Sequence, residues 1–318
     1  MKKIIFALLS SQFLLACGGS GGTPEKSEVI VQPPNIDEQI HYEIPTVDYQ
    51  AESIIKLVDF NGRQAIDYTE DLFDADFDLH WQWIGKSGEH IDGVAKIIDV
   101  NGDMKLAISS LKDEVKVGIH AGKDLTEANE LYFLYELTFN GDYDFAKGGK
   151  LPGLGGLNLS DANEIKPTGC RSEGQQIDAG FSLRSMFKED GVAILYAYYQ
   201  NNPNLELPES DGKYACGEEI SYQHNGKPFS FQKTKAYLVE QYVKINDANQ
   251  ENGIVTIHVN GFKVLEKIDM VFSENGQYSI NQLFIDIWHG GSTSDWAPSV
   301  DSTVVIDNIA LSDSPLTY

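Results

Sequence analysis

This chain of 318 residues has little cysteine and little positive charge. It holds three cysteines, and no histidines stand beside them at the spacing of a zinc site, so we expect no metal and no cofactor. Its 24 basic residues are outnumbered by 48 acidic ones, and the formal net charge of −24 argues against nucleic acid as a partner. The apolar run near the N-terminus is too short for a transmembrane helix. The composition favours an acidic protein without a membrane-spanning helix.

Familiar catalytic motifs are absent as well. No serine lies in the Gly-x-Ser-x-Gly elbow of serine hydrolases, and no His-Glu-x-x-His zinc motif occurs. Acidic residues are too numerous to single out the carboxylate pair of a glycosidase. Glu136 shares a predicted strand face with Tyr132 and Thr138, so it stays open as a carboxylate base, although a solvent-facing strand residue is the favoured interpretation.

The N-terminus has the pattern of an exported lipoprotein. Lys2 and Lys3 precede a short apolar run, and Leu14-Leu15-Ala16-Cys17 resembles the bacterial lipobox. We predict that residues 1–17 are a signal peptide whose Cys17 is lipidated, with an ordinary signal peptide and a chance cysteine as the alternative. Residues 18–44 are rich in Gly and Pro and predict a flexible tether. Gly18 is not the aspartate associated with inner-membrane retention, so we expect the outer membrane, at its periplasmic or surface face.

Cys170 and Cys216 remain once Cys17 is set aside. An even number of cysteines in an exported chain is typical of a disulfide. We therefore predict a Cys170–Cys216 bond.

Regular turn signals predict an all-β fold from about residue 46. Asn-Gly pairs occur at residues 61, 101, 140, 225, 252, 260 and 275, and β-branched and aromatic segments lie between them. No interior linker divides the chain, so we predict one β-jelly-roll sandwich over residues 45–318. Helix is restricted to short turns, at residues 71–78 and 279–283. We expect a monomer.

Residues 181–199 predict a β-hairpin. Two alternating segments flank Asp190-Gly191, a pair that tolerates the positive φ of tight turns. A three-residue loop with Gly191 in the left-handed conformation places Arg184 opposite Tyr196, and Ser182 opposite Tyr198, on one face. A two-residue loop would split this polar set. The hairpin is expected to present Ser, Arg, Tyr and Tyr together.

Several segments carry a family resemblance. They are the glycine-rich run 145–154, Cys170, residues 181–187, residues 195–198 and residues 290–298. In this order they resemble polysaccharide lyase family 14, the alginate and glucuronan lyases, over roughly residues 125–311 and more weakly from residue 46. The resemblance implies a β-jelly roll that cleaves uronic-acid polymers, an acidic polysaccharide, by β-elimination without a required metal. Its matching positions imply the functional set Lys150, Ser182, Arg184, Tyr196 and Tyr198.

Elimination needs a cation for the sugar carboxylate, a base and an acid. We expect Arg184 and Lys150 to neutralise the carboxylate, and Ser182 to orient the substrate. Tyr196 and Tyr198 are the candidates for base and acid, on the expectation that nearby cations favour a phenolate, and neither role is assigned. Further substrate contacts are expected from Lys147, Trp288, His289 and Trp296.

Two other classes of function stay open. The first is a non-catalytic glycan-binding surface lipoprotein on the same jelly roll, since a fold does not establish a function. The second is a structural or adhesive lipoprotein, which is supported only by the predicted lipid anchor and the acidity of the chain. The two tryptophans are equally compatible with core packing.

Overall fold

The computed structural model describes residues 43–79, 81–86, 88–157, 167, 180–205, 217–291 and 293–316. The predicted signal peptide with Cys17 and nearly all of the predicted tether lie outside these residues, as do Cys170 and Cys216. Lipidation and the disulfide therefore stay predictions.

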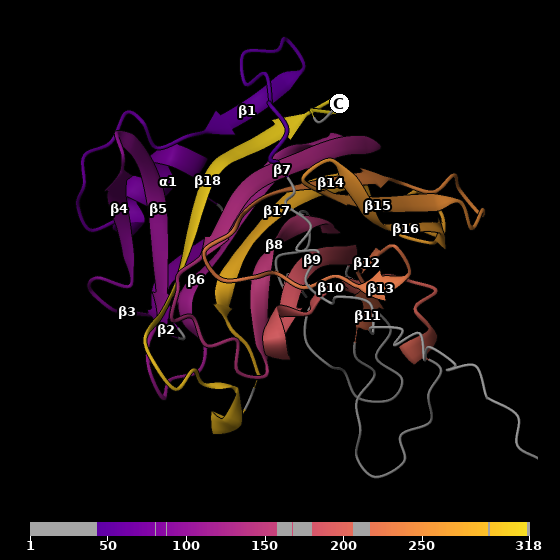
Figure 1. The fold of residues 1–318 in the computed structure, drawn as a ribbon. Helices are drawn as coiled ribbons and strands as arrows, with labels where there is room; N and C mark the ends of the chain where they lie inside the picture. The colour runs from indigo at the N-terminus through magenta and orange to yellow at the C-terminus, as the bar shows by residue number, and fades with distance from the viewer. Residues whose placement is uncertain are drawn as a thin grey trace, which may run out of the picture. The chain divides into compact units, whose positions relative to one another are not determined.

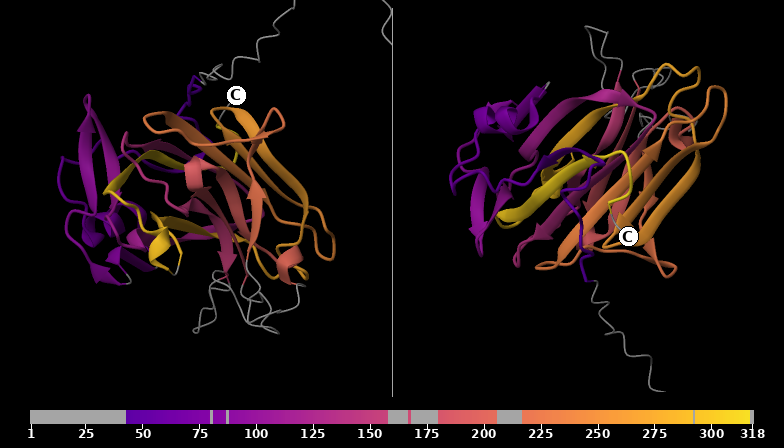
Figure 2. Two further views of the ribbon diagram at one scale, coloured as in Figure 1. Left: turned by 60° about the horizontal axis from the view of Figure 1, so that its bottom comes forward. Right: turned by 90° about the horizontal axis from the view of Figure 1, so that it is seen from above.

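Two antiparallel sheets of eight strands form the fold (Figure 1). Sheet A has the order β16-β15-β14-β7-β18-β5-β4, with β1 also paired to β18. Sheet B has the order β11-β10-β9-β8-β17-β6-β2-β3. The predicted all-β jelly-roll sandwich is confirmed, and Figure 2 shows its layers from two further directions.

The strands have the following bounds. Sheet A comprises β1 (Ile54–Val58), β4 (Ala95–Val100), β5 (Asp103–Ser110), β7 (Glu130–Phe139), β14 (Ala236–Lys244), β15 (Gly253–Val259), β16 (Phe262–Met270) and β18 (Ser302–Ser312). Sheet B comprises β2 (Trp81–Lys86), β3 (Glu89–His90), β6 (Val117–Ala128), β8 (Gly148–Leu157), β9 (Gly180–Lys188), β10 (Ala193–Tyr198), β11 (Glu218–Ser221) and β17 (Ile280–His289). A small ribbon adds β12 (Gln223–His224) and β13 (Lys227–Pro228).

Helix is as scarce as predicted, but it lies at only one of the two predicted places. The helix α1 (Glu70–Phe77) begins at Thr69, whose side chain accepts a hydrogen bond from the Leu72 amide. The helical turn predicted at residues 279–283 is wrong, because Ile280 begins β17. Alternate residues of this strand pack into the core, which favours a strand over a turn. No helix of the described residues is long and apolar enough to cross a membrane.

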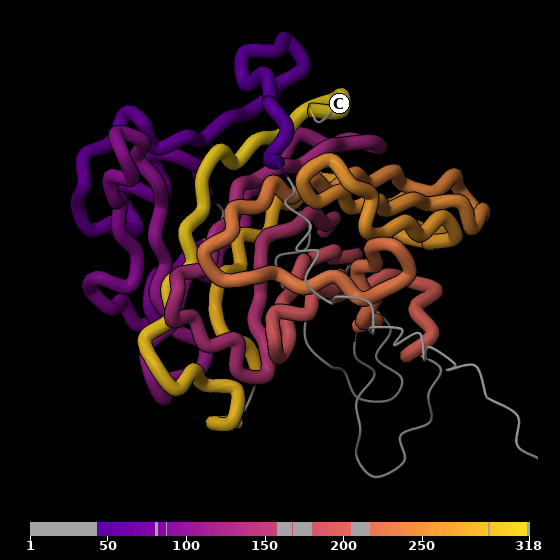
Figure 3. The backbone as a smooth tube through the Cα atoms, viewed as in Figure 1, coloured from indigo at the N-terminus to yellow at the C-terminus, as the bar shows by residue number. Residues whose placement is uncertain are grey.

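The chain ends of the domain meet in sheet A. Strand β1 pairs antiparallel with β18, so that Leu57 lies opposite Ala310. Figure 3 shows this pairing as the indigo and yellow segments running together. The core between the sheets contains aromatic and aliphatic side chains of both, such as Phe133 from β7 and Leu183 from β9. Burial of these side chains is the main stabilising contribution.

Most of the glycine-rich run lies in β8, a central strand of sheet B. It pairs with β9 on one side and β17 on the other. A Cβ at Gly153 would lie 1.9 Å from the Leu183 carbonyl oxygen, so only glycine permits this approach. The register shifts between Lys150 and Gly153 in both pairings, where Pro152 has no amide hydrogen to donate. Glycine here serves strand packing.

The hairpin of β9 and β10 has the predicted register. Tyr196 pairs with Arg184, and Tyr198 pairs with Ser182. Residues Glu189–Gly191 form the three-residue loop, with φ of +73° at Gly191. Both the register and the left-handed glycine are confirmed.

Gly191 should be far less tolerant of alanine than Gly226. The two residues have nearly the same φ, +73° and +74°, so each alanine is in the left-handed region at a cost of about 1 to 2 kcal/mol. Only at Gly191 would the added Cβ clash, 2.2 Å from the Phe231 carbonyl oxygen, whereas nothing lies within 4 Å at Gly226. Urea unfolding of Gly191→Ala should show the larger loss of stability. Equal losses would mean that contact with Phe231 does not fix this turn.

Candidate active site

The polar side chains of the hairpin project from the face of sheet B that is turned away from the core. Leu183 and Leu195 pack inward and are fully buried, so the alternate residues point to the opposite face. The residues gathered there from β9 and β10 are Ser182, Arg184, Met186, Tyr196 and Tyr198. Four of the predicted site residues therefore lie together on one surface.

Lys150 joins this group from β8. It pairs with Met186 in the neighbouring strand, and its Nζ lies 3.0 Å from the Met186 Sδ. The same Nζ is 4.1 Å from the centre of the Tyr196 ring. The residue is only 9% exposed, and no carboxylate among the described residues lies within ion-pair distance of its amine. A thioether and a ring face replace the usual ion-pair partner.

The environment of Lys150 favours the neutral amine. Burial, and then the positive charge of Arg184, lower the pKa of Lys150 well below its usual 10.5. A lowered pKa increases the share of the neutral amine, which is the form of lysine that can accept a proton. This differs from the predicted role of Lys150 as a second cation for the substrate carboxylate.

Tyr196 and Tyr198 form a pair of phenols. Their rings lie 5.2 Å apart at 83°, and the Tyr198 hydroxyl donates to the Tyr196 oxygen at 3.4 Å. Burial, and next the neighbouring Tyr198, raise the pKa of Tyr196 above its usual 10, and the opposing effect of Arg184 is smaller. Tyr196 therefore keeps its proton, which corrects the expectation that nearby cations favour its phenolate. It has the character of an acid.

Arg184 is held by Asp286 of β17. The Arg184 Nη1 donates to the Asp286 Oδ2 at 2.6 Å, and both side chains are buried. Gly153 of β8 pairs with Arg184, and a Cβ there would lie 2.8 Å from the Arg184 Cα. The Arg184 Nε is buried and has no hydrogen-bond partner in the described part of the chain. This Nε–H is a donor available to a bound anion.

Asp286 binds a second partner, the imidazole of His120 in β6, through the His120 Nδ1. Burial alone would raise the pKa of Asp286, but His120 and Arg184 outweigh it and hold the pKa below the usual value of 3.8. The carboxylate is ionised and fully buried between two donors. Such a group is stable only because both partners are present.

Sequence reasoning missed Asp286, His120, Met186 and Trp83. A signal for Asp286 existed, since Leu283, Ile285 and Ile287 alternate with Phe284, Asp286 and Trp288 along β17. That alternation puts Asp286 on the same face as Arg184, once the order of the strands is known. No local pattern marks His120 or Trp83, because only the pairing of β6 with β17, and of β2 with β6, brings them there.

The predicted substrate contacts divide into two groups. Trp288 pairs with Lys150 on the site face and is partly exposed. Trp296 is partly exposed under the Lys188 Nζ, 5.5 Å from its ring, and Lys147 forms an ion pair with Asp295 near one end of the hairpin. These three residues remain candidates for substrate binding.

His289 and Ser182 are placed differently from the prediction. His289 is fully buried, its ring stacks on Tyr143 at 5.3 Å and its Nε2 donates to the Asp144 carbonyl at 2.6 Å. Burial lowers the pKa of His289 to about 4, so it is a neutral core residue and not a substrate contact. The Ser182 hydroxyl is fully buried and donates to the Pro167 carbonyl at 2.7 Å.

Glu136 lies in β7 of sheet A, so the strand order separates it from the hairpin face. It accepts hydrogen bonds from Tyr49 and Asn308. This position excludes Glu136 as the base that would act beside Arg184. Glu136 is a strand residue as favoured, but it is not simply solvent-facing, because its side chain is 23% exposed and lies 3.6 Å from the Lys105 amine.

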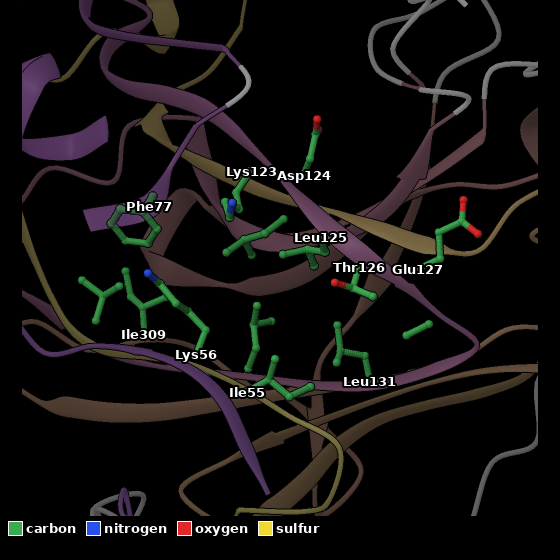
Figure 4. Close-up of a pocket in the computed structure, with 14 residues that line it drawn as sticks. Ile55, Lys56, Phe77, Lys123, Asp124, Leu125, Thr126, Glu127, Leu131 and Ile309 are labelled. Carbon is green, nitrogen blue, oxygen red and sulfur yellow. The ribbon is translucent and has the colours of Figure 1, made fainter. Parts of the chain in front are cut away.

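An apolar cavity of about 470 Å³ opens between the two sheets (Figure 4). Ile55 of β1 and Leu131 of β7 line one side, and Leu125 of β6 lines the other (Figure 4). Its walls are mainly aliphatic and include none of the residues around Arg184. Among the residues that the structure describes, no three metal-ligating side chains gather anywhere. The site for chemistry is therefore the face of sheet B.

Comparison with solved structures shows the same fold in alginate lyases. Alginate lyase Aly36B superposes with a TM-score of 0.64 at 20% identity, over 83% of this chain and 98% of that one. The alginate lyase of the mollusc Aplysia kurodai gives 0.59 at 19% identity, over 78% and 97%. The alginate lyase vAL-1 of a Chlorella virus gives 0.58 at 18% identity, over 80% and 99%.

Sequence comparisons complete the assignment. No curated protein matches the chain. The family model for polysaccharide lyase 14 matches residues 110–309, more than half of the chain, and this stretch includes every residue placed on the site face except Trp83. The predicted resemblance is confirmed: the chain belongs to the polysaccharide lyase 14 family and is a polysaccharide lyase.

Proposed function

We propose that the protein cleaves a polyuronate of the alginate type by β-elimination, with Lys150 as the base and Tyr196 as the acid. The observation that carries this proposal is the buried amine of Lys150, which has a lowered pKa and lies 4.1 Å from the ring of a tyrosine with a raised pKa. Two groups whose environments push their pKa values apart are suited to opposite proton transfers.

The reaction uses the neutral amine of Lys150 and the protonated phenol of Tyr196. The neutral Lys150 amine removes the proton on the ring carbon next to the carboxylate. The electron pair left behind forms a carbon–carbon double bond as the bond to the glycosidic oxygen breaks. The Tyr196 phenol gives its proton to that leaving oxygen, and the Tyr198 hydroxyl, which donates to the Tyr196 oxygen, stabilises the phenolate formed. The products are an unsaturated uronate end and a new free hydroxyl.

Arg184 is proposed to bind the carboxylate of the reacting sugar. Negative charge moves onto the sugar carboxylate as the proton leaves, and a fixed guanidinium in a water-poor site stabilises that charge strongly. Its buried Nε–H has no hydrogen-bond partner among the described residues and can donate to such an anion, while the Nη1 is bound to Asp286. Ser182 is not assigned a direct contact with the substrate, because its hydroxyl donates a hydrogen bond to the Pro167 carbonyl.

Alginate is the proposed substrate because the superposed lyases are named for it, and variants of Aly36B are solved with an alginate trisaccharide and an alginate tetrasaccharide. The purified domain from residue 45 onward, mixed with alginate, glucuronan and a neutral glucan, should produce ultraviolet absorbance with alginate. Absorbance with glucuronan alone would reassign the substrate. Binding of alginate without absorbance would support the glycan-binding module instead.

Lys150→Arg separates a base from a cation. Arginine keeps the positive charge but cannot become a neutral base, so Lys150→Arg should lose elimination as completely as Lys150→Met. Retention of activity by Lys150→Arg would restore the role of a second cation for the carboxylate.

The proposed acid and base also set the pH dependence of the wild type. Its kcat/KM should rise with pH through the lowered pKa of Lys150, because the base must be neutral. It should fall only in the alkaline range, where Tyr196 loses its proton. Tyr196→Phe should lower kcat by about 10² to 10⁴-fold. Tyr199→Phe is the matched control, because its hydroxyl bonds Glu218 and lies off the face.

We also propose that the mature protein is a lipid-anchored monomer of the outer membrane, tethered through residues 18–44. The support is the lipobox-like Leu14-Leu15-Ala16-Cys17 followed by the Gly-rich segment. Cys17→Ala should move the protein from the membrane fraction to the soluble envelope fraction. If the variant still sediments with membranes, lipidation at Cys17 is not what anchors the protein.

A further inference from the structure

The placement of Lys150 on the site face depends on an irregular segment, residues 150–153 of β8. At its start, Lys150 pairs with Met186 of β9. At its end, three residues later, Gly153 pairs with Arg184, which is only two residues from Met186. Over this stretch β8 therefore has one residue more than β9, as in a β-bulge, which is a feature that re-aims side chains.

The extra residue decides which side chains of β8 face the core. Leu151 and Leu154 both belong to the core and are fully buried. Residues three positions apart point to opposite faces of a regular strand, so these two can share a face only because the segment is irregular. In strict alternation counted back from Leu154, Lys150 would point into the core and Leu151 would lie on the site face. The irregular segment is what turns Lys150 to the site face.

Gln241 of β14 in sheet A is a polar side chain at a core-facing position. Val239 and Val243, two residues before and after it, belong to the core. Its partners in the neighbouring strands, Phe133 and Ile257, are fully buried core residues as well. Gln241 itself is 1% exposed. An amide in such surroundings is costly unless its hydrogen bonds are made.

The amide of Gln241 makes those bonds to the backbone of sheet B. Its Oε1 accepts from the Leu154 amide at 2.8 Å, and its Nε2 donates to the Leu183 carbonyl at 3.0 Å. Leu154 and Leu183 lie opposite each other in β8 and β9. Amide and carbonyl groups of a regular ladder bond to the neighbouring strand, so a partner from the other sheet is unusual. It occurs directly after Gly153, where the irregular segment ends.

The bonded groups lie close to the proposed reacting side chains in the chain. Leu183 directly precedes Arg184 in β9, and Leu154 follows the irregular segment that begins at Lys150. The Lys150 amine has only weak contacts of its own, with the Met186 Sδ at 3.0 Å and with a tyrosine ring whose centre is 4.1 Å away. Its position therefore depends on the backbone of β8.

We propose that Gln241 is a positioning residue for the elimination, because its side-chain amide fixes the irregular segment that turns Lys150 to the site face. The same amide fixes β9 at the residue before Arg184. Gln241 lies on the core side of the sheets and acts through Lys150, without contact with the substrate. This inference rests on the proposed function, because it assigns Gln241 to the placement of the proposed base.

Gln241→Met removes the amide and keeps a side chain of similar length. Without its two hydrogen bonds the irregular segment loses its restraint, and kcat should fall about 10²-fold, as for a displacement of about 1 Å in a reacting group. KM should change little, because the ion pair with Asp286 still holds Arg184. Steady-state kinetics of the full-length protein measure both quantities, and thermal unfolding shows whether the variant is folded.

Asn281→Leu is the matched control. Asn281 is also a buried amide bound to the backbone of β8, since its Oδ1 accepts from the Leu157 amide and its Nδ2 donates to the Leu157 carbonyl, both at 2.8 Å. Leu157 is the last residue of β8 and lies beyond the irregular segment. Asn281→Leu should lose stability and keep the kcat of the wild type. Equal falls of kcat in the two variants, or no fall in Gln241→Met, would overturn the proposal.

Gln241→Glu tests whether the hydrogen bonds themselves matter. A protonated carboxyl has one acceptor and one donor, so it can serve both Leu154 and Leu183, and burial favours this protonated form. At acid pH the kcat of Gln241→Glu should be close to that of the wild type at the same pH. As pH rises and the carboxyl ionises, it can no longer donate to the Leu183 carbonyl, and the ratio should fall toward that of Gln241→Met. A ratio as low as that of Gln241→Met at every pH would contradict the proposal.

The pKa of Lys150 gives a readout that lost stability alone does not change. Burial and then Arg184 lower this pKa. The weaker charge effects come from Asp286, Lys188 and Glu219. A displaced amine is less buried, so its pKa in Gln241→Met should rise toward the usual 10.5. The rising limb of kcat/KM should then shift to higher pH, and in Asn281→Leu it should stay in place.

Carbon NMR of the full-length protein, labelled at the lysine Cε, measures the same pKa without any elimination. Lys150→Met identifies the signal of Lys150. A raised pKa in Gln241→Met, in a protein whose wild type cleaves no polyuronate, would reject the proposed elimination and keep the placement of Lys150 by Gln241. Lyase activity with an unchanged pKa of Lys150 in Gln241→Met would reject the role of Gln241 alone.

Discussion

The site depends on the buried ion pair between Asp286 and Arg184, which leaves the neighbouring Lys150 without a carboxylate partner among the described residues. Arg184 and Lys150 both lie on the face of sheet B, but Asp286 contacts only Arg184. Arg184 has an ion-pair partner, whereas burial and then the charge of Arg184 lower the pKa of Lys150, whose amine contacts the Met186 thioether. One face of a sheet thus holds a cation with a carboxylate partner and a buried amine without one, and burial is the main cause of the lowered pKa of Lys150.

This distribution depends on the geometry of β8. The strand lies between β9 and β17, and its glycines let the backbones approach where any Cβ would clash. Gly153 lets β8 approach the backbone of β9 at Leu183 and Arg184, while Lys150, before the irregularity at Pro152, aligns with Met186 and Trp288. The glycine-rich strand β8 therefore provides both the close backbone contact with β9 and the proposed base, Lys150. A residue with a side chain at Gly153 would push β8 away from β9.

Sequence reasoning succeeded where a pattern is local. The turn chemistry of Asp190-Gly191 determined the register that brings Arg184 opposite Tyr196, and the fold class followed from repeated turn signals. It failed where the outcome depends on which strands become neighbours. Asp286 is far from Arg184 in the chain, and His289 next to Trp288 was assigned to the surface although its alternation turns it into the core beside Tyr143. The acid and base roles also needed burial, which no spacing reveals.

The acidity of the chain bears on how a polyanion can be bound at all. With 48 acidic against 24 basic residues, the long-range field of the protein repels a polyuronate, although at physiological ionic strength the field is screened beyond about 8 Å. The site adds little net attraction, because Asp286 neutralises Arg184 and Lys150 is disposed to be uncharged. Recognition must therefore come from short-range contacts: directional hydrogen bonds from a fixed guanidinium, and ring stacking on partly exposed tryptophans. Burial and then the charge of Arg184 lower the pKa of Lys150, while the charge of Asp286 opposes this, so the same buried carboxylate acts on both the anion-binding group and the base.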